Sequence, residues 1–190
     1  MGERGAKRRG AGRTPNGPRA LVSHKERPRF GKAMPAHVTL RVRNHVWNLR
    51  SRRSFRRIQA CFEKSRGRFG GRLIEFSMQG NHLHLIVEAD GSESLSRAMQ
   101  GLCIRIAKSM NALMGRAGAV FSDHYHARLL RSPTELMKAI RYVLGNAAHH
   151  FAADGTDPFS SAALVPAERF TVLAVPLGWL LRDGWRRALL

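Results

Sequence analysis

The chain has 190 residues, a length suited to one domain with tails, and 43% of them are hydrophobic, enough to form a buried core. Its 33 Lys and Arg residues outnumber 13 Asp and Glu residues, so the formal net charge is +20. This excess favours nucleic acid as a partner, because basic side chains that neutralise phosphates release condensed counterions. No segment is apolar enough to span a bilayer or to follow the basic N-terminus as a signal peptide, so no membrane partner is expected.

The two cysteines, Cys61 and Cys103, both lie within predicted helices. A pair of this kind disfavours a disulfide framework and suits a reducing compartment, so the predicted location is cytoplasmic. Both thiols are expected to be small, buried apolar groups.

Residues 1–33 contain ten Lys and Arg residues, against Glu3 and Glu26, with scattered Gly and Pro and few apolar side chains. This composition predicts a disordered basic arm that can hold phosphates without ordering much of the chain. A solvated tail with no specific role is an equally good interpretation.

Periodic apolar residues predict the secondary structure of the following region. Alternation with a period of two predicts strands over residues 37–43, 72–78, 82–88 and 124–131. In the second of these strands, Ile74, Phe76 and Met78 are expected on one face and Leu73 on the other. Helical spacing predicts helices over residues 49–68, from a cap at Ser92 or Ser94 to about 116, and over 134–150.

The predicted order is βαββαβ followed by a helix. This is the pattern of an α+β, ferredoxin-like sandwich, with an antiparallel sheet, two helices on one face, and an added helix at the end. The expected domain therefore covers residues 34–151. Residues 152–190 are expected to form an irregular tail, in which Trp179 and Trp185 either pack on the domain or contact DNA.

His82 and His84 alternate with apolar residues in the third predicted strand, just after a Gly80–Asn81 turn that tolerates positive φ. Their rings share one face, roughly 7 Å apart along the chain, and can form half of a divalent metal site. Two hydrogen-bonded sheet histidines are the alternative interpretation. A second His-X-His pair, His124 and His126, begins the fourth predicted strand.

The last predicted helix places Tyr142 and Asn146 one turn apart, within about 40° of each other and to one side of its apolar stripe. A tyrosine beside an amide that can bind a metal is a candidate nucleophile. The alternative is a tyrosine at the edge of the core, with its hydroxyl directed to solvent.

The sequence from Gly80 to Leu85, GNHLHL, resembles the His-hydrophobic-His motif of HUH single-tyrosine nucleases. The sequence from Tyr142 to Asn146, YVLGN, resembles their tyrosine helix. Together with RLLR at residues 128–131, these motifs are most similar to the REP-associated tyrosine transposase-like group of the IS200-type transposases. The resemblance covers residues 34–150. Many relatives have Asn-Pro after the tyrosine, whereas Ala147 follows Asn146 here.

The resemblance implies that His82, His84 and Asn146 hold Mg²⁺ or Mn²⁺ and that Tyr142 attacks a phosphodiester in single-stranded or hairpin DNA. Cleavage would give a 5′-phosphotyrosine and a 3′-OH whose reattack rejoins the strand, and a homodimer is possible. The two imidazoles favour Mn²⁺ at least as much as Mg²⁺. Candidate phosphate contacts are Arg52, Arg53, Arg56, Arg57, Arg97, Arg105 and Lys108.

Two other functions fit the same residues. A domesticated relative could bind hairpin DNA or RNA without cutting it, using the basic arm and the arginine-rich helix. A zinc-dependent hydrolase could use one His-X-His pair, but it needs another His or an acidic residue to complete the site.

Overall fold

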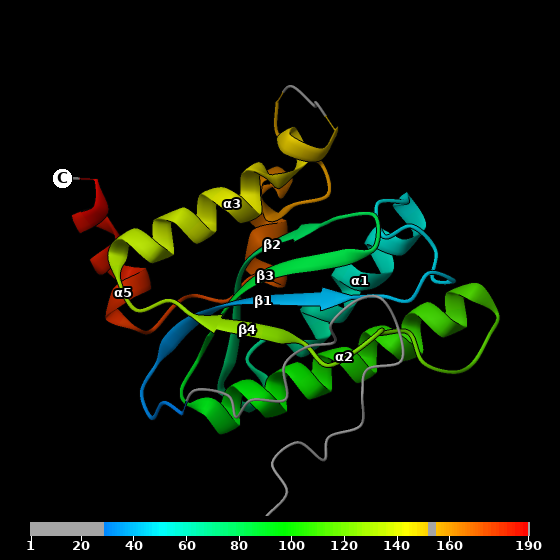
Figure 1. Ribbon diagram of the computed structural model, residues 1–190, viewed down its shortest axis with the longest axis horizontal. Coiled ribbons are helices and arrows are strands. Elements are labelled where there is room, and N and C mark those ends of the chain that lie inside the picture. The colour runs from blue at the N-terminus through cyan, green and yellow to red at the C-terminus, as the bar shows by residue number, and fades with distance from the viewer. Residues whose placement is uncertain (1–28, 152–154, 190) are drawn as a thin grey trace, which may run out of the picture.

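The computed structural model describes residues 29–151 and 155–189, with the backbone alone for residues 147–151 (Figure 1). The strands are β1 (Met34–Arg41), β2 (Gly71–Met78), β3 (His82–Ala89) and β4 (His126–Leu129). The helices are α1 (Arg52–Ser65), α2 (Ser92–Met114), α3 (Pro133–Phe151), α4 (Pro166–Val172) and α5 (Trp179–Arg182). Short 3₁₀ segments are η1 (Arg68–Gly70), η2 (Ser161–Ala163) and η3 (Gly184–Ala188). The predicted basic arm lies outside the described residues through position 28.

The four strands form one sheet in the order β2-β3-β1-β4, and every neighbouring pair is antiparallel. The chain order through β4 is βαββαβ, and α3 follows it. The predicted antiparallel sandwich with an added helix is therefore confirmed. The bounds of the strands and helices up to α3 differ from the predicted ones by a few residues, as expected where end residues lack the periodic signal.

The sheet separates two layers of helices (Figure 1). On one face, α1 and α2 bury side chains such as Ile58 and Met99 against Leu40 and Leu85 of the central strands. On the other face, α3 packs through Leu136, Ala139 and Val143 onto a smaller apolar cluster that includes Ile74 and Ile86. Helix α3 therefore covers only part of this second face of the sheet. Polar residues of the strands lie on the same face, beside the helix.

A β-bulge in β2 changes which face its first residues occupy. Leu73 pairs with Val87, and Glu75 pairs with Ile86, so Ile74 is the extra residue. As a result Ile74 joins the cluster under α3, whereas Leu73 packs with Phe76 and Met78 against the larger core. The expectation that Ile74 shares a face with Phe76 and Met78 was wrong, because strict alternation does not allow for an inserted residue.

The start of α2 also differs from the prediction. Its N-cap is Gly91, which has an extended backbone, and no side chain caps the helix there, so the expected Ser92 or Ser94 cap was wrong. In α1 the cap is a serine: Ser51 Oγ accepts a hydrogen bond from the Ser54 amide at 3.2 Å.

The segment after α3 is not irregular. Leu164, Val172 and Leu173 belong to the larger core, and Leu181 and Trp185 pack with the cluster under α3. Of the two tryptophans in this segment, Trp185 is thus packed on the domain, whereas Trp179 is 52% exposed. The prediction missed this because short helical turns carry too few residues to show a period.

The carboxylate of Glu88 attaches this segment to the sheet. Glu88 is fully buried at the end of β3, and it accepts hydrogen bonds from the amides of Leu177 and Gly178 at 2.8 and 2.7 Å. It also pairs with Arg72 at 2.6 Å. Within the described part of the chain, no helix has the length and apolar character needed to cross a membrane.

Candidate functional site

The hairpin between β2 and β3 places the first histidine pair. The amide of Gln79 donates to the carbonyl of His82 at 2.8 Å, and the carbonyls of Gly80 and Asn81 accept from Leu49 and Val42. The predicted turn is therefore present and is tied to the connection between β1 and α1. Neither Gly80 nor Asn81 has positive φ, so the conformational freedom expected of them is not used.

The rings of His82 and His84 lie on the sheet face that carries α3, with centroids 4.8 Å apart and planes at 90°. His82 Nδ1 is 2.9 Å from Asn81 Oδ1. A carboxamide oxygen can only accept, so His82 donates its Nδ1 proton and carries a lone pair on Nε2. A lone pair on Nε2 is what a metal ion requires of this ring.

His84 is 4% exposed and is held through the same ring nitrogen. Its Nδ1 lies 3.1 Å from His37 Nε2 and 3.3 Å from Thr39 Oγ1, both on β1. The register explains this contact, because Thr39 is directly opposite His84 in the β1–β3 pair.

His37 was not predicted as a site residue. The signal was present in the alternation of His37, Thr39 and Arg41 on the polar face of strand β1, but only the strand pairing shows which residues they meet. Burial lowers the pKa of His37, and nearby His126 and Arg128 lower it further, so the neutral ring is favoured.

Tyr142, on α3, lies against His84 and His37. Its ring centroid is 5.2 Å from that of His84 and 5.7 Å from that of His37, with edge-to-face geometry in both pairs. The neighbouring Val143 is fully buried and fixes this face of α3 against the sheet, while Tyr142 stays 47% exposed. The tyrosine is therefore anchored and still accessible to a large substrate.

Asn146 lies one turn beyond Tyr142 and is 1% exposed. Strand β4 ends beside the start of β1, which pairs with the end of β3, so α3 runs back toward the start of β3. Asn146 is thus about 6 Å farther along the helix in the direction of His82. In the part of the chain that the structure describes, its Nδ2 has no hydrogen-bond partner.

Among the described side chains, no third His, Cys, Asp or Glu completes a metal site with His82 and His84. Among residues 29–151 and 155–189, no three His, Cys, Asp or Glu side chains whose positions are described are placed to hold one metal ion. The zinc-hydrolase interpretation required such a residue. An amide oxygen is a different type of ligand, and the buried carboxamide of Asn146 is the candidate to supply it.

An open cavity of about 680 Å³ extends from this cluster along α3. His37, His84 and Tyr142 line one end, and Arg128 and Lys138 line the rest together with hydroxyl side chains. Lys138 is exposed one turn before Tyr142, and Arg128 pairs with Glu135 at 3.1 Å. Cationic side chains therefore lie beside the tyrosine. They are not among the phosphate contacts predicted from the sequence.

The predicted phosphate contacts lie in the opposite layer of the molecule. They belong to α1 and α2, which cover the sheet face away from Tyr142. The four α1 arginines are exposed, Arg97 lies over the ring of Phe69, and Arg105 donates to Ser65. These cations form a surface distinct from the histidine–tyrosine cluster. The second histidine pair is separated from His84 by β1: His124 and His126 are exposed around buried Tyr125, and His126 lies opposite Thr39, close enough to lower the pKa of His37.

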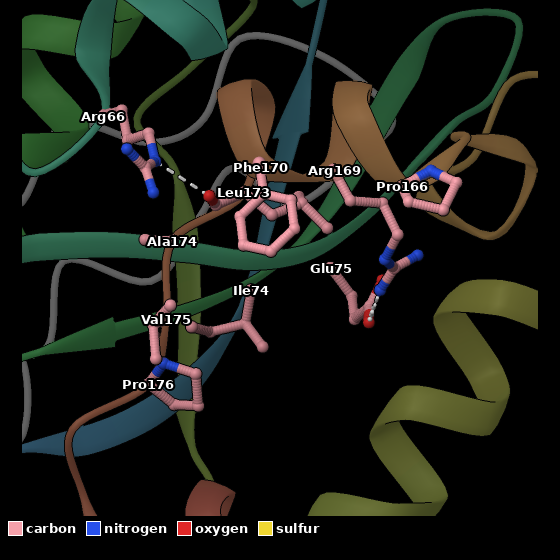
Figure 2. Close-up of a pocket in the computed structure, with 10 residues that line it drawn as sticks. All are labelled: Arg66, Ile74, Glu75, Pro166, Arg169, Phe170, Leu173, Ala174, Val175 and Pro176. Atoms are coloured by element: carbon pink, nitrogen blue, oxygen red, sulfur yellow. Dashed lines mark hydrogen bonds and ion pairs between the residues drawn. The ribbon is translucent and has the colours of Figure 1, made fainter.

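A second hollow, of about 390 Å³, lies at the outer edge of β2 beside α4 (Figure 2). Figure 2 shows Arg169 paired with Glu75 and Arg66 donating to the carbonyl of Leu173. Both arginines hold the segment after α3 against the sheet edge. None of the site residues predicted from the sequence lines this hollow.

Comparisons with known proteins bear on the family and on the fold. The family described as "Transposase IS200 like" matches residues 32–146. The solved structure of a REP-associated tyrosine transposase bound to a REP hairpin has a TM-score of 0.60 at 15% identity, over 83% of this chain and 94% of that one. The solved structure of a putative transposase from Deinococcus radiodurans R1 has a TM-score of 0.45 at 12% identity, over 63% of this chain and 95% of that one. No curated protein matches the sequence.

Proposed function

Because the chain belongs to the IS200-like transposase family, we propose that it cleaves and rejoins single-stranded DNA with Tyr142 as the nucleophile. In this proposal His82, His84 and Asn146 hold a Mg²⁺ or Mn²⁺ ion. The observation that supports it most is the contact between Tyr142 and His84, because it brings the candidate nucleophile to the candidate metal ligands within one chain.

The donor set fits a divalent ion. The Nδ1 atom of His82 donates to Asn81, and the Nδ1 atom of His84 lies within hydrogen-bond distance of His37 and Thr39 on β1. In both rings, Nε2 can therefore bind the ion. The buried carboxamide of Asn146 supplies an oxygen, and two nitrogens with one oxygen suit Mn²⁺ at least as well as Mg²⁺. When bound, the ion acts as a Lewis acid that polarises the scissile phosphate.

The rest of the reaction uses the chain's own side chains. The Tyr142 hydroxyl loses its proton as its oxygen attacks phosphorus and forms the new P–O bond. The bond from phosphorus to the 3′ oxygen breaks, and the 3′ oxygen takes up a proton and leaves as a hydroxyl. The downstream strand is then joined to Tyr142 through its 5′ phosphate. Reattack by a 3′-OH reverses these steps and rejoins DNA without another energy source.

Lys138 and Arg128 are placed to bind the strand near the tyrosine, because both line the cavity that ends at its ring. Their charges would lie beside phosphates that flank the reacting one. The arginines of α1 would serve a different purpose, binding DNA on the opposite side of the sheet. The hairpin in the similar solved structure makes a hairpin with single-stranded flanks a reasonable first substrate.

The test is covalent capture of DNA. The full-length protein is incubated with Mn²⁺ and hairpin oligonucleotides that have labelled single-stranded flanks, and adducts are resolved by denaturing electrophoresis and peptide mass spectrometry. We expect an adduct on Tyr142 that disappears in Tyr142→Phe and His82→Ala. Tyr125→Phe is the matched control, because Tyr125 is the other tyrosine of the chain. An adduct that persists in Tyr142→Phe would exclude this nucleophile.

A non-cleaving nucleic-acid binder is the second candidate. It is favoured by the exposed α1 arginines, which are independent of the histidine–tyrosine cluster. In that case, hairpin binding survives loss of both His82 and His84, and no adduct forms with any divalent metal.

A further inference from the structure

The two histidines among the candidate metal ligands are held by different kinds of partner. His82 uses its neighbour Asn81, whereas His84 uses a side chain 47 residues away on another strand. We infer that His37 is a positioning residue that fixes the ring and the tautomer of His84, and that it does so by accepting the His84 Nδ1 proton through Nε2. This inference rests on the proposed function for the metal, but its first test needs no metal.

The direction of the hydrogen bond decides what His84 can do. If His37 Nε2 donated, His84 Nδ1 would be the acceptor and the His84 proton would lie on Nε2, so neither nitrogen could bind a metal. If His84 Nδ1 donates, its Nε2 carries a lone pair. Histidine ligands in metal sites are oriented in this second way, by an acceptor on the nitrogen that does not bind the metal.

Thr39 is compatible with the same direction, because its hydroxyl can accept a hydrogen bond as well as donate one. Its hydroxyl oxygen lies 3.3 Å from the same His84 nitrogen and can accept a share of the proton while its own hydrogen points elsewhere. His37 and Thr39 are two residues apart on β1, so they project from the same face of one strand. A central strand of the sheet is thus the rigid support for both acceptors.

His37 also contacts the candidate nucleophile. The rings of His37, His84 and Tyr142 lie in mutual contact, with centroid separations of 5.2 Å, 5.7 Å and 5.2 Å around the triangle. Because no third His, Cys, Asp or Glu among the described side chains completes a metal site, His37 is assigned a supporting place and not a ligand position. It sets where His84 points and limits how close Tyr142 approaches.

The first test is the tautomer of His84 in the metal-free protein, measured from the ¹⁵N chemical shifts and long-range couplings of its ring. We expect a protonated Nδ1 and an unprotonated Nε2 in the wild type, and a mixture of tautomers in His37→Leu. A wild-type His84 that carries its proton on Nε2 would overturn the inference, whatever the outcome of the cleavage experiment.

The second test is Mn²⁺ affinity, measured by titration with electron paramagnetic resonance detection. We expect His37→Leu to weaken binding by about 10- to 100-fold, the range found when a partner of a metal-binding histidine is removed. His37→Gln should recover most of the affinity, because its side-chain oxygen can accept the same proton. His124→Leu is the matched control, since it removes an exposed histidine away from the cluster.

These outcomes separate the inference from the proposed function. Equal Mn²⁺ affinity in wild type and His37→Leu overturns the role of His37 and leaves the metal site in place. Absence of Mn²⁺ binding by the wild type contradicts the proposed metal chemistry, and the tautomer measurement then decides the inference alone. Circular dichroism and thermal unfolding of each variant show whether the fold is retained.

Discussion

Tyr142 lies edge-on to His84 of the same chain, with the two ring centroids 5.2 Å apart and the planes at 80°. The contact joins α3 to a central strand, and buried Leu136 and Val143 hold that helix against the sheet. The nucleophile and the metal ligands of the proposed site are therefore provided by one copy of the chain. A dimer, if it forms, is not needed to complete this cluster.

The first prediction follows from that geometry. When Tyr142→Phe and His82→Ala proteins are mixed in equal amounts, we expect no DNA adduct, because each copy supplies both halves of its own site. The measurement is the same denaturing gel used for the wild type. Restoration of an adduct in the mixture would mean that the tyrosine of one copy acts at the histidines of another.

The second prediction separates the two cationic surfaces. Lys138→Ala removes a charge from the cavity beside Tyr142, so we expect a slower cleavage rate even when DNA is saturating. Arg52→Ala combined with Arg53→Ala removes charges from the opposite side of the sheet, so we expect weaker DNA binding with little change in that saturated rate.

The measurements for this comparison are single-turnover cleavage over a range of DNA concentrations and the salt dependence of binding. Each lost phosphate contact on a single strand should reduce the slope of log K against log salt by about 0.7. A normal saturated rate for Lys138→Ala would show that the strand does not pass through this cavity.

Local periodicity explains why the candidate site residues could be assigned to strand and helix faces from the sequence. His82, His84, Tyr142 and Asn146 each lie in an element whose own apolar residues define it, and a few consecutive positions suffice to assign their faces. That α3 lies on the same sheet face as the histidines could be expected only from the resemblance to known nucleases. The sequence alone left both histidines and the tyrosine open to a purely structural interpretation.

The parts that were missed depend on information that is not local. His37 meets His84 because β1 and β3 pair in one particular register, which no single strand specifies. The bulge at Ile74 interrupts an otherwise regular alternation. The segment after α3 is held by specific contacts, such as those of Arg66 and Glu88, and these are not visible in a hydrophobic pattern.

The third prediction concerns the cysteines. Burial raises the pKa of Cys103 to about 12 from 9.0, and burial also raises the pKa of Cys61. For Cys103, this rise lowers the thiolate fraction at pH 8 by about a thousandfold, so we expect alkylation by iodoacetamide to be slow in the folded protein. Mass spectrometry of the labelled peptides should show fast labelling only after unfolding in urea. The structure buries Cys61, as expected, and leaves Cys103 half-buried. Rapid labelling of either thiol without denaturant would contradict its raised pKa.

The fourth prediction tests the attachment of the C-terminal segment through Glu88. Glu88→Ala removes the acceptor for two backbone amides and leaves Arg72 buried with Asp90 as its remaining acidic partner among the described residues. Loss of one partner of a buried ion pair costs about 3–5 kcal/mol, so we expect a decrease of that size in the free energy of unfolding by urea. Limited proteolysis should also cut more readily after residue 173, because the Leu177 and Gly178 amides lose their acceptor.

Asp90→Asn is the matched control for Glu88→Ala, because Asp90 bonds the same guanidinium from an exposed position. We expect it to cost no more than about 1 kcal/mol. The hydrogen bond from Arg72 lowers the pKa of Asp90, so the stabilisation is present above the ordinary Asp pKa and is lost as the pH falls through the lowered value. If Glu88→Ala unfolded at the same urea concentration as Asp90→Asn, the buried carboxylate would not be what holds this segment to the sheet.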